Sequence, residues 1–350
     1  MIFVASRSLT IGSCASALVL ALALTSGAAR AQEKSQEKSQ DKTYVMKIPA
    51  PTQNASPDTY ARKLGAAIEK ESGGRIKVEV YPASQLGSIP RQIEGTQFGA
   101  IQCAVIPPEF FVGVDERFEV LAAPGLVSSV AQAQRMAIDP QVQTLMLGLG
   151  ADKGLRGVGL LLGEPNQIIA KTAIRHLDDL KGKKIRIFAS PFQTATFQRL
   201  GATPVAMTLG DVLPAIQQGA IDGAIGGIEA FNGLHFYDTA KYITMTNHAA
   251  IFLVVEVSKK WYESLPADLQ QIVDRTAASV AAGINPDLDE LEAKASASWT
   301  EHGGELIKLP AAEQAEMLKI LTSVGADVAK TKPNVQAAYD IVTAAAQRAK

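Results

Sequence analysis

The chain has 350 residues, with 34 lysines and arginines against 35 aspartates and glutamates, which gives a net charge of −1 at pH 7. This balance leaves no electrostatic case for nucleic-acid binding. The length exceeds the usual size of a single domain, so two lobes are the natural expectation.

The first 31 residues are typical of a secretory signal peptide. Arg7 precedes a short apolar run at residues 15–24, and Ala29-Arg30-Ala31 offers the small residues of a cleavage site. The run is shorter than the roughly 20 residues of a membrane-spanning helix, and no later run is long enough. We therefore predict export to the periplasm, cleavage after Ala31 and a soluble mature protein. Cys14 precedes the apolar run, whereas a lipid-modified cysteine follows it, which disfavours a lipid anchor.

Residues 32–43 are predicted to form a disordered tether, because the segment is polar and of low complexity and has nothing to bury. Cys103 is the only cysteine beyond the predicted signal peptide. The exported protein is therefore expected to have no internal disulfide, although the periplasm permits one.

Two stretches of the chain repeat the same order of predicted elements. The first has strands at 44–48, 76–80 and 100–105, with helices at 57–72 and 90–98. The second has strands at 184–188 and 220–225, with helices at 191–201 and 209–218. Both stretches predict β-α-β units, which favour a mainly parallel sheet with helices on both faces.

The two stretches also share short sequences where their helices begin. Ala55-Ser56-Pro57 opens a helix in the first, and Ala189-Ser190-Pro191 opens one in the second. A two-fold architecture explains this similarity, and so does the common use of such caps; the sequence leaves both explanations open. Farther along, residues 251–257 predict an apolar strand, and residues 266–299 predict a long helical stretch interrupted at Pro286.

The sequence contains no recognisable catalytic or metal-binding motif. The four histidines lack the spacing of metal ligands, a G-x-S-x-G elbow is absent, and the glycines at 148, 150 and 154 miss the spacing of a dinucleotide-binding loop. We therefore expect a binding protein and not an enzyme, with no cofactor and no metal-ligating residues; the sequence leaves open whether a metal ion assists ligand binding.

Arg186 is the most unusual polar residue in its local sequence. It lies within Ile185-Arg186-Ile187, a strand otherwise built for burial, and a buried cation is costly unless it is paired. Its partner is either a carboxylate of the protein, such as Asp222, or the carboxylate of a ligand, which a guanidinium binds through two parallel hydrogen bonds. The local sequence alone does not choose between these partners.

Short segments spaced along the chain form a recognisable series. They are YPASQLG at 81–87, LKGKKIR at 180–186, LGATPV at 200–205, QGAIDG at 218–223, KY at 241–242, TNH at 246–248 and SKKW at 258–261. In order and spacing they resemble the DctP-type solute-binding subunits of TRAP (tripartite ATP-independent periplasmic) transporters. The resemblance covers nearly the whole mature chain.

This resemblance implies a two-lobed α/β fold of the periplasmic-binding-protein kind. Each lobe is expected to be a mainly parallel sheet flanked by helices, and a long helix is expected to span the hinge. We expect residues 44–163 and 252–290 in the first lobe, and residues 164–251 and 291–350 in the second. The resemblance also implies that the lobes close on a small organic acid, that Arg186 binds its carboxylate, and that a small and a large membrane subunit receive it.

Two departures from the family pattern bear on the ligand. Many members carry Glu-Asn-Pro or a close variant shortly after Asp-Gly, where this chain has Ala224-Ile225-Gly226-Gly227, and many carry a polar or cationic side chain where this chain has the neutral amides of Asn166 and Gln167. Both changes remove polar contacts, and the glycines are expected to open space. We therefore expect a monocarboxylate with a largely apolar body, such as a branched or aromatic acid or a 2-oxo acid. The predicted ligand-binding residues are Arg186, Asn166, Gln167, Phe188, Met207, Ile225, Gly226 and Pro108.

Two other functions are compatible with these features. A binding protein that serves a sensor kinase would have the same sequence, and the neighbouring genes would distinguish it. An enzyme on a similar scaffold is disfavoured, because no nucleophile and base stand together in the sequence. Glu109 is expected at the surface; in the cleft it would repel an anion or hold a cation.

Overall fold

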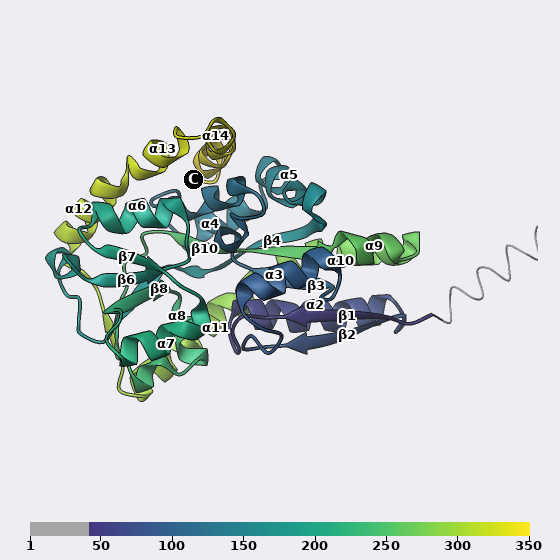
Figure 1. The fold of residues 1–350 in the computed structure, drawn as a ribbon, viewed down its shortest axis with the longest axis horizontal. Helices are drawn as coiled ribbons and strands as arrows, with labels where there is room; N and C mark the ends of the chain where they lie inside the picture. Colours follow the sequence, from purple (N-terminus) through teal and green to yellow (C-terminus); the bar gives the residue numbers. More distant parts are fainter. Residues whose placement is uncertain (1–41) are drawn as a thin grey trace, which may run out of the picture. The chain divides into compact units, whose positions relative to one another are not determined.

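The computed structural model of the chain describes residues 42–350 (Figure 1). The predicted signal peptide and all but the last two residues of the predicted tether lie outside this range. Within the described range, no helix is long and apolar enough to cross a membrane.

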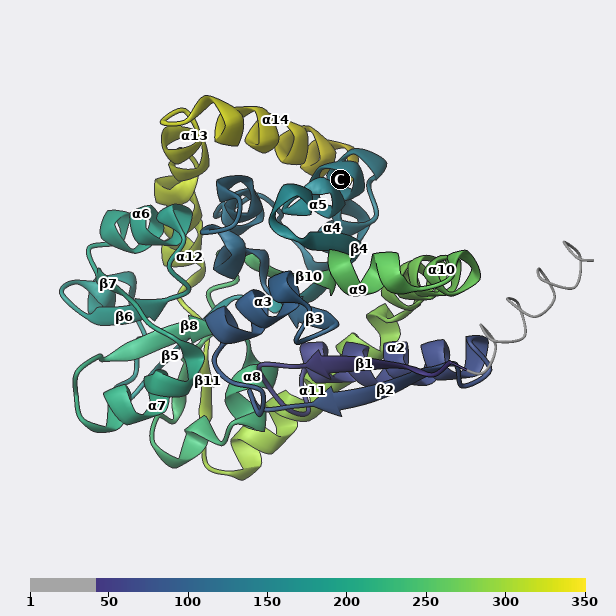
Figure 2. The ribbon, with the colours of Figure 1, turned by 45° about the vertical axis from the view of Figure 1, so that its right-hand side comes forward.

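The first lobe contains two small sheets (Figures 1 and 2). Their strands are β1 (Tyr44–Pro49), β2 (Ile76–Tyr81), β3 (Cys103–Ile106), β4 (Leu155–Pro165) and β10 (Ala250–Ser258). β1 and β2 run parallel, whereas β10 lies between β3 and β4 and is antiparallel to both. Every residue of β10 is buried, as expected for the apolar run predicted at 251–257.

The second lobe is built on one six-stranded sheet with the order β11-β9-β5-β8-β6-β7. Its strands are β5 (Gln167–Ala170), β6 (Lys184–Ile187), β7 (Thr203–Ala206), β8 (Gly223–Gly226), β9 (Tyr242–Thr244) and β11 (Glu305–Ile307). β6, β7 and β8 run parallel, as the repeated β-α-β pattern predicts, whereas β5 is antiparallel to β8 and β9. The two-lobed α/β fold is confirmed. The expectation of a mainly parallel sheet fits the second lobe, where β5 alone is reversed, but the three-stranded sheet of the first lobe is antiparallel throughout.

Helices flank the sheets of both lobes (Figures 1 and 2). They are α2 (Ser56–Glu71), α3 (Ile89–Phe98), α4 (Val130–Ala137), α5 (Pro140–Gly148), α6 (Pro191–Arg199), α7 (Leu209–Gln217), α8 (Ile228–Gly233), α9 (Lys259–Ser264), α10 (Ala267–Gly283), α11 (Asn285–Glu301), α12 (Ala311–Leu321), α13 (Val324–Ala329) and α14 (Pro333–Arg348). Short 3-10 helices, η1 (Pro108–Phe111) and η2 (Glu116–Ala122), follow β3.

The long helical stretch predicted at 266–299 is a pair of helices that meet at Ile284. Pro286 lies in the first turn of α11, where its missing N–H removes no helical hydrogen bond. α10 packs against α2 and β4, whereas α11 packs against α8 and β11. The pair therefore passes from the first lobe to the second.

The last helix, α14, packs against α4, α5 and η2 of the first lobe, and the two views agree on this placement (Figures 1 and 2). Its small residues Ala338, Ala345 and Ala346 join the core there, and Gln132 Nε2 donates a hydrogen bond of 2.7 Å to the carbonyl of Ala346. Our boundaries assign 291–350 to the second lobe. The division of the chain between the lobes stays a prediction, and α14 is the element whose contacts depart from it.

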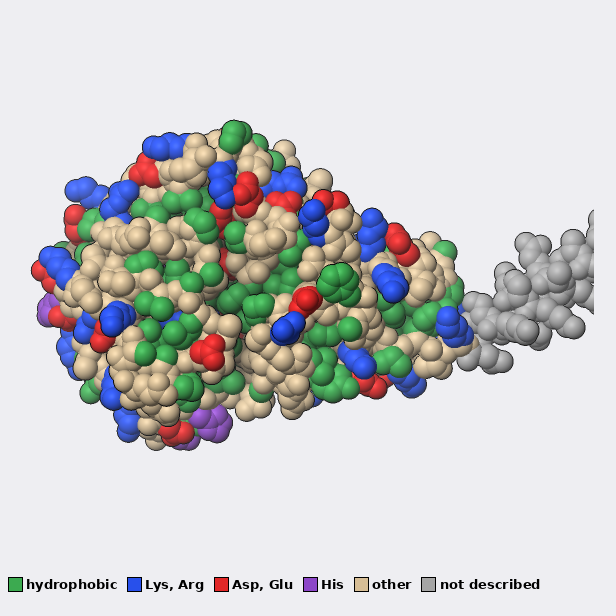
Figure 3. Space-filling model, in the orientation of Figure 1, with side chains coloured by type: hydrophobic (Ala, Val, Ile, Leu, Met, Phe, Trp, Pro, Cys, Tyr) green, Lys and Arg blue, Asp and Glu red, His purple; other side chains and the backbone are tan. Residues whose placement is uncertain are grey.

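Charged side chains of both signs are scattered over the face shown in Figure 3, with no large patch of one sign. This distribution agrees with the near-zero net charge.

Cys103 is fully buried in the first lobe and is the only free cysteine in the described range.

Glu256 is a glutamate in the core of the first lobe. Glu256 of β10 is completely buried, and neither of its carboxylate oxygens accepts a hydrogen bond within residues 42–350. Burial raises the pKa of this carboxyl well above its ordinary value of 4.5. The folded protein therefore keeps a proton that the unfolded chain releases, so stability is lost as pH rises above the unfolded value.

We expect Glu256→Gln to raise the melting temperature at pH 8 by a few degrees and to change it little near pH 4. Glutamine keeps the shape of the side chain and removes the cost of keeping the acid neutral. Thermal unfolding at both pH values measures the effect, with the exposed Glu263→Gln as control. An equal gain at both pH values would show that ionisation of Glu256 is not the cause.

Candidate functional site

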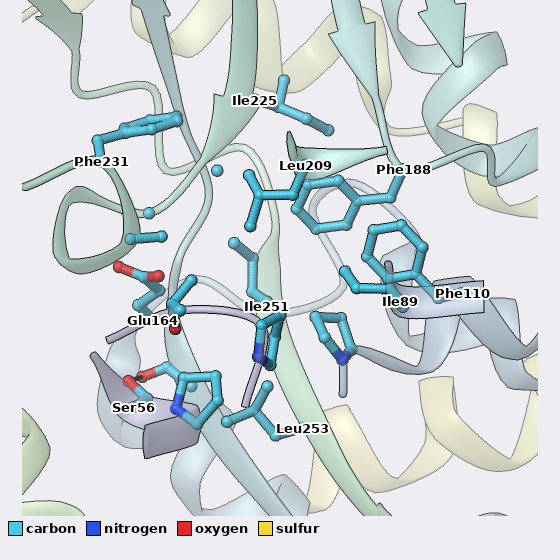
Figure 4. A pocket seen from close by; sticks show the side chains of 18 of the residues that line it. Ser56, Ile89, Phe110, Glu164, Phe188, Leu209, Ile225, Phe231, Ile251 and Leu253 are labelled. Atoms are coloured by element: carbon cyan, nitrogen blue, oxygen red, sulfur yellow. Dashed lines mark hydrogen bonds between the residues drawn. The ribbon is translucent and has the colours of Figure 1, made fainter. Parts of the chain in front are cut away.

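A cavity of about 50 Å³ lies where the two lobes face each other (Figure 4). Its walls come from the carboxyl ends of strands β4, β6 and β8, where α/β sheets bind ligands, and from β10 and the start of α2. Phe110 of the first lobe stacks on Phe188 of the second, with ring centroids 5.1 Å apart. The wall is mainly apolar and includes Ile89, Leu209, Ile225, Phe231, Ile251 and Leu253.

Arg186 is the one lysine or arginine that lines this cavity within the described chain. Its side chain is 1% exposed. Nε donates to the carbonyl of Met207 at 3.0 Å, and Nη1 donates to the carbonyl of Ile225 at 3.4 Å. Nη2 has no hydrogen-bond partner among residues 42–350. The guanidinium carbon lies 4.8 Å from the centre of the Phe188 ring. Burial lowers the pKa of Arg186 to about 9, so the side chain remains a cation at neutral pH.

Asp222 is not the partner of Arg186. Its carboxylate accepts a hydrogen bond of 2.8 Å from the backbone N–H of Lys184, at the start of the same strand. Among the described residues no acid forms an ion pair with Arg186. A buried cation without a counter-ion is unfavourable by itself, so the arrangement favours binding of an anion from outside the chain.

The structure brings four of the predicted ligand-binding residues together. Arg186, Phe188, Ile225 and Gly226 all line the cavity. Met207 does not line it, although its backbone carbonyl holds the Arg186 side chain. Arg186 lies in β6 and Phe188 directly follows it, whereas Ile225 and Gly226 end β8, the neighbouring strand of the sheet.

The other three predicted residues lie outside the lining of the cavity. Pro108 starts η1, and its neighbour Pro107 lines the wall instead. Gln167 is bound to Asn247, because its Nε2 donates to Oδ1 at 2.5 Å and its Oε1 accepts from the backbone N–H. Asn166 is buried, and its Oδ1 has no hydrogen-bond partner in the part of the chain that the structure describes. A ligand contact from any predicted residue stays a prediction.

Glu164, at the end of β4, lines the cavity and was missed by the sequence analysis. It occupies the space beside Gly227, where a Cβ atom would lie only 1.7 Å from the Glu164 Cδ. A Cβ atom at Gly226 would likewise lie 2.9 Å from the Phe231 ring. Our expectation that this glycine pair opens space for ligand is therefore wrong. The glycines make room for side chains of the protein.

Three carboxyl groups gather at this end of the cavity. Glu164 accepts a hydrogen bond of 2.9 Å from the backbone N–H of Glu229, at the start of α8. Glu229 in turn accepts from the backbone N–H of Ser56 at 2.8 Å and from the Ser56 hydroxyl. Burial raises the pKa of Glu164 well above its usual range and that of Glu229 to about 7, and burial also raises the pKa of Glu292.

A second serine and glutamate pair joins the lobes elsewhere. The Ser190 hydroxyl, which caps α6, donates at 3.2 Å to Glu119 of η2. Burial raises the pKa of Glu119 to about 7. The serines of the two similar sequences, Ser56 and Ser190, therefore each bind a buried glutamate of the other lobe. This contact gives the sequence similarity a structural role.

Glu109 is neither at the surface nor in the cavity wall, contrary to both expectations. It is 2% exposed, and its Oε2 has no hydrogen-bond partner in the described chain. Burial raises the pKa of Glu109 to about 8, so the acid is largely neutral at pH 7.

Comparison with known proteins gives a consistent picture. The family model for bacterial extracellular solute-binding proteins of family 7, DctP, matches residues 50–332. The chain is 32% identical over 212 residues to the uncharacterized protein YiiZ of Salmonella typhimurium. The matched region covers 60% of this chain and 65% of that protein. It is 29% identical over 273 residues to the C4-dicarboxylate-binding periplasmic protein DctP of Rhodobacter capsulatus. That matched region covers 77% of this chain and 81% of that protein.

Solved structures share the fold. A TRAP periplasmic solute binding protein from Desulfovibrio salexigens, with bound orotic acid, matches with a TM-score of 0.82 and 22% identity over 88% of this chain and 100% of that chain. One from Shewanella oneidensis, with bound succinate, matches with a TM-score of 0.79 and 24% identity over 87% of this chain and 99% of that chain. At these identities the matches show the architecture alone.

Proposed function

Because the chain belongs to the DctP family, the bacterial extracellular solute-binding proteins of family 7, we propose that it is a periplasmic receptor of a TRAP transporter. It binds a small organic anion between its lobes and delivers it to a small and a large membrane subunit. The observation that carries this proposal is Arg186, a buried cation whose Nη2 is free to bind a carboxylate in an interlobe cavity. The family consists of solute-binding proteins, so the site binds its ligand without transforming it.

The ligand we propose has one carboxylate and a largely apolar body. The carboxylate binds Arg186, and the body packs against Phe110, Phe188 and Leu209. A sugar acid would need hydrogen-bond partners for its hydroxyl groups, and this wall is mainly apolar. Succinate, the ligand bound to the Shewanella oneidensis relative, carries a second carboxylate and is therefore more polar than the ligand proposed here.

We expect branched or aromatic monocarboxylates and their 2-oxo acids to bind more tightly than succinate, malate or galacturonate, by about tenfold or more. A second carboxylate buried without a counter-ion costs several kcal/mol, and each buried hydroxyl without a partner costs about 1–3 kcal/mol. A thermal-shift screen over organic acids identifies binders, since a ligand of the native state raises the melting temperature. Competition by titration calorimetry, on protein stripped of carried-over ligand, then ranks them. Tighter binding of a dicarboxylate or a sugar acid than of every apolar monocarboxylate would contradict the proposed ligand class.

A further inference from the structure

The cavity has a basic residue, Arg186, at one end and an acidic residue, Glu164, at the other. Figure 4 places Phe188, whose ring lies against the Arg186 guanidinium, on one side, and Glu164 near Ser56 and Phe231 on the other. The side chains of Leu209 and Ile251 lie between them. A ligand that fills the cavity therefore meets a cation at one end, apolar walls along its body and an acid at the other end.

Backbone N–H groups hold the carboxyl group of Glu164 at the acidic end of the cavity. The carboxylate of Glu164 accepts hydrogen bonds from the backbone N–H groups of Glu229 and Ala230, and these donors favour its charged form. Yet no lysine or arginine of the described chain forms an ion pair with Glu164, Glu229 or Glu292. The charged groups that face Glu164, from α8 and α11, are both acids.

The absence of a counter-cation has a measurable consequence for Glu164. Burial comes first among the causes that raise its pKa, and the charges of Glu229 and Glu292 raise it further. In the ligand-free cavity these causes therefore favour the protonated form of the acid. A positive charge delivered by a ligand would remove this cost, whereas a second ligand carboxylate would increase it.

We propose that Glu164 determines specificity and that the cavity takes a zwitterion, with a carboxylate on Arg186, an apolar chain and a positively charged amino group at Glu164. This inference rests on the proposed function and narrows its ligand class. The proposal does not depend on the acids alone. Arg186 lines the same cavity, is 1% exposed, and its Nη2 has no hydrogen-bond partner in the described chain. No group of acids, histidines or cysteines in residues 42–350 is arranged to hold a metal ion.

The test uses three ligands that differ only in the group at one end of the same chain. Pentanoate, 4-aminobutanoate and pentanedioate carry a methyl, an ammonium and a carboxylate group beyond three methylenes, and their homologues with four and five methylenes vary the length. Calorimetry on wild-type protein should show the amino acid binding about tenfold or more tightly than the methyl compound, and the diacid binding most weakly, because like charges in an interface are strongly unfavourable.

Glu164→Gln should abolish this order. Glutamine keeps the length of the side chain and an oxygen for the Glu229 N–H, but it carries no charge. In this variant the ammonium ligand should bind within about threefold of the methyl ligand, because glutamine has no negative charge to strengthen the contact with the ammonium group. Glu119→Gln is the matched control, since it alters a buried interlobe glutamate that does not line the cavity. It should leave the preference intact.

Wild-type protein supplies a second measurement that needs no variant. Calorimetry in buffers of different ionisation enthalpy counts protons, and binding of the ammonium ligand should release a proton from Glu164, whereas binding of the methyl ligand should not. If the methyl compounds bind as well as the amino compounds, and no proton is released, the zwitterion is ruled out and the receptor for an apolar monocarboxylate stands. If no compound of the series binds, the proposed ligand class falls with it.

Discussion

Arg186→Ala is expected to weaken binding of a carboxylate ligand on the order of 100-fold or more, because each hydrogen bond to a charged group is worth about 1.5–3 kcal/mol and a guanidinium can make two. Arg186→Lys should restore only part of the affinity, since an ammonium group lacks the planar fork of donors. Titration calorimetry measures both changes.

Removing the charge of Arg186 should weaken ligand binding but stabilise the ligand-free protein. Arg186 is a buried cation with no counter-ion in the described chain, so Arg186→Met, which keeps the bulk and removes the charge, should raise the melting temperature of the ligand-free protein. Arg199→Ala, at an exposed arginine paired with Asp327, is the control and should leave ligand affinity unchanged. Unchanged affinity in folded Arg186→Ala would refute the assigned role.

Gly227→Ala is expected to cost about 1–3 kcal/mol of stability, as overfilled cores do. Its Cβ atom would lie 1.7 Å from Cδ and 2.1 Å from Cγ of Glu164, so the glutamate must move away from α8. The displaced side chain should also lower ligand affinity, because it lines the cavity. Thermal melts and calorimetry test the two effects. Gly210→Ala, where a Cβ atom would meet open space, is the matched control.

A double-mutant cycle isolates the cause of this loss. Glu164→Ala removes the atoms that the new methyl group would meet, so Gly227→Ala should cost much less in that background. The coupling between the two sites should be about 1 kcal/mol or more, within the range for residues in direct contact. If the stability losses of the two substitutions are additive, a clash with Glu164 is not the reason that position 227 requires glycine.

Local sequence patterns were sufficient for most helices and strands. Pro191 begins α6 and Pro286 lies in the first turn of α11, because proline is favoured where a helix starts and disfavoured within it. Strand direction was not predictable in the same way. β5 and β10 run antiparallel to their neighbours, and that depends on pairing between segments far apart in the sequence. The position of α14 has the same origin, since its alanines predict a helix but not its partner.

The residues of the site also differ in how far local sequence could predict them. Arg186 stood out because a charge between two isoleucines of a buried strand needs an explanation from nearby sequence alone. Glu164 gave no such signal, because its role depends on Gly227 and on the backbone N–H of Glu229, which only the folded chain brings close. Gly227 was identified as unusual, but an absent side chain does not reveal what fills its place.

Cys103 has a practical consequence for watching this protein at work. It is the only cysteine in the described chain, it is fully buried, and burial raises the pKa of its thiol, so reagents that need an exposed thiolate have no ready target in the folded state. A pair of dyes attached through new cysteines, one on α2 and one on α6, would therefore label the intended positions without labelling Cys103. Energy transfer between such dyes could follow single molecules as they capture and release ligand, with the native thiol left in place.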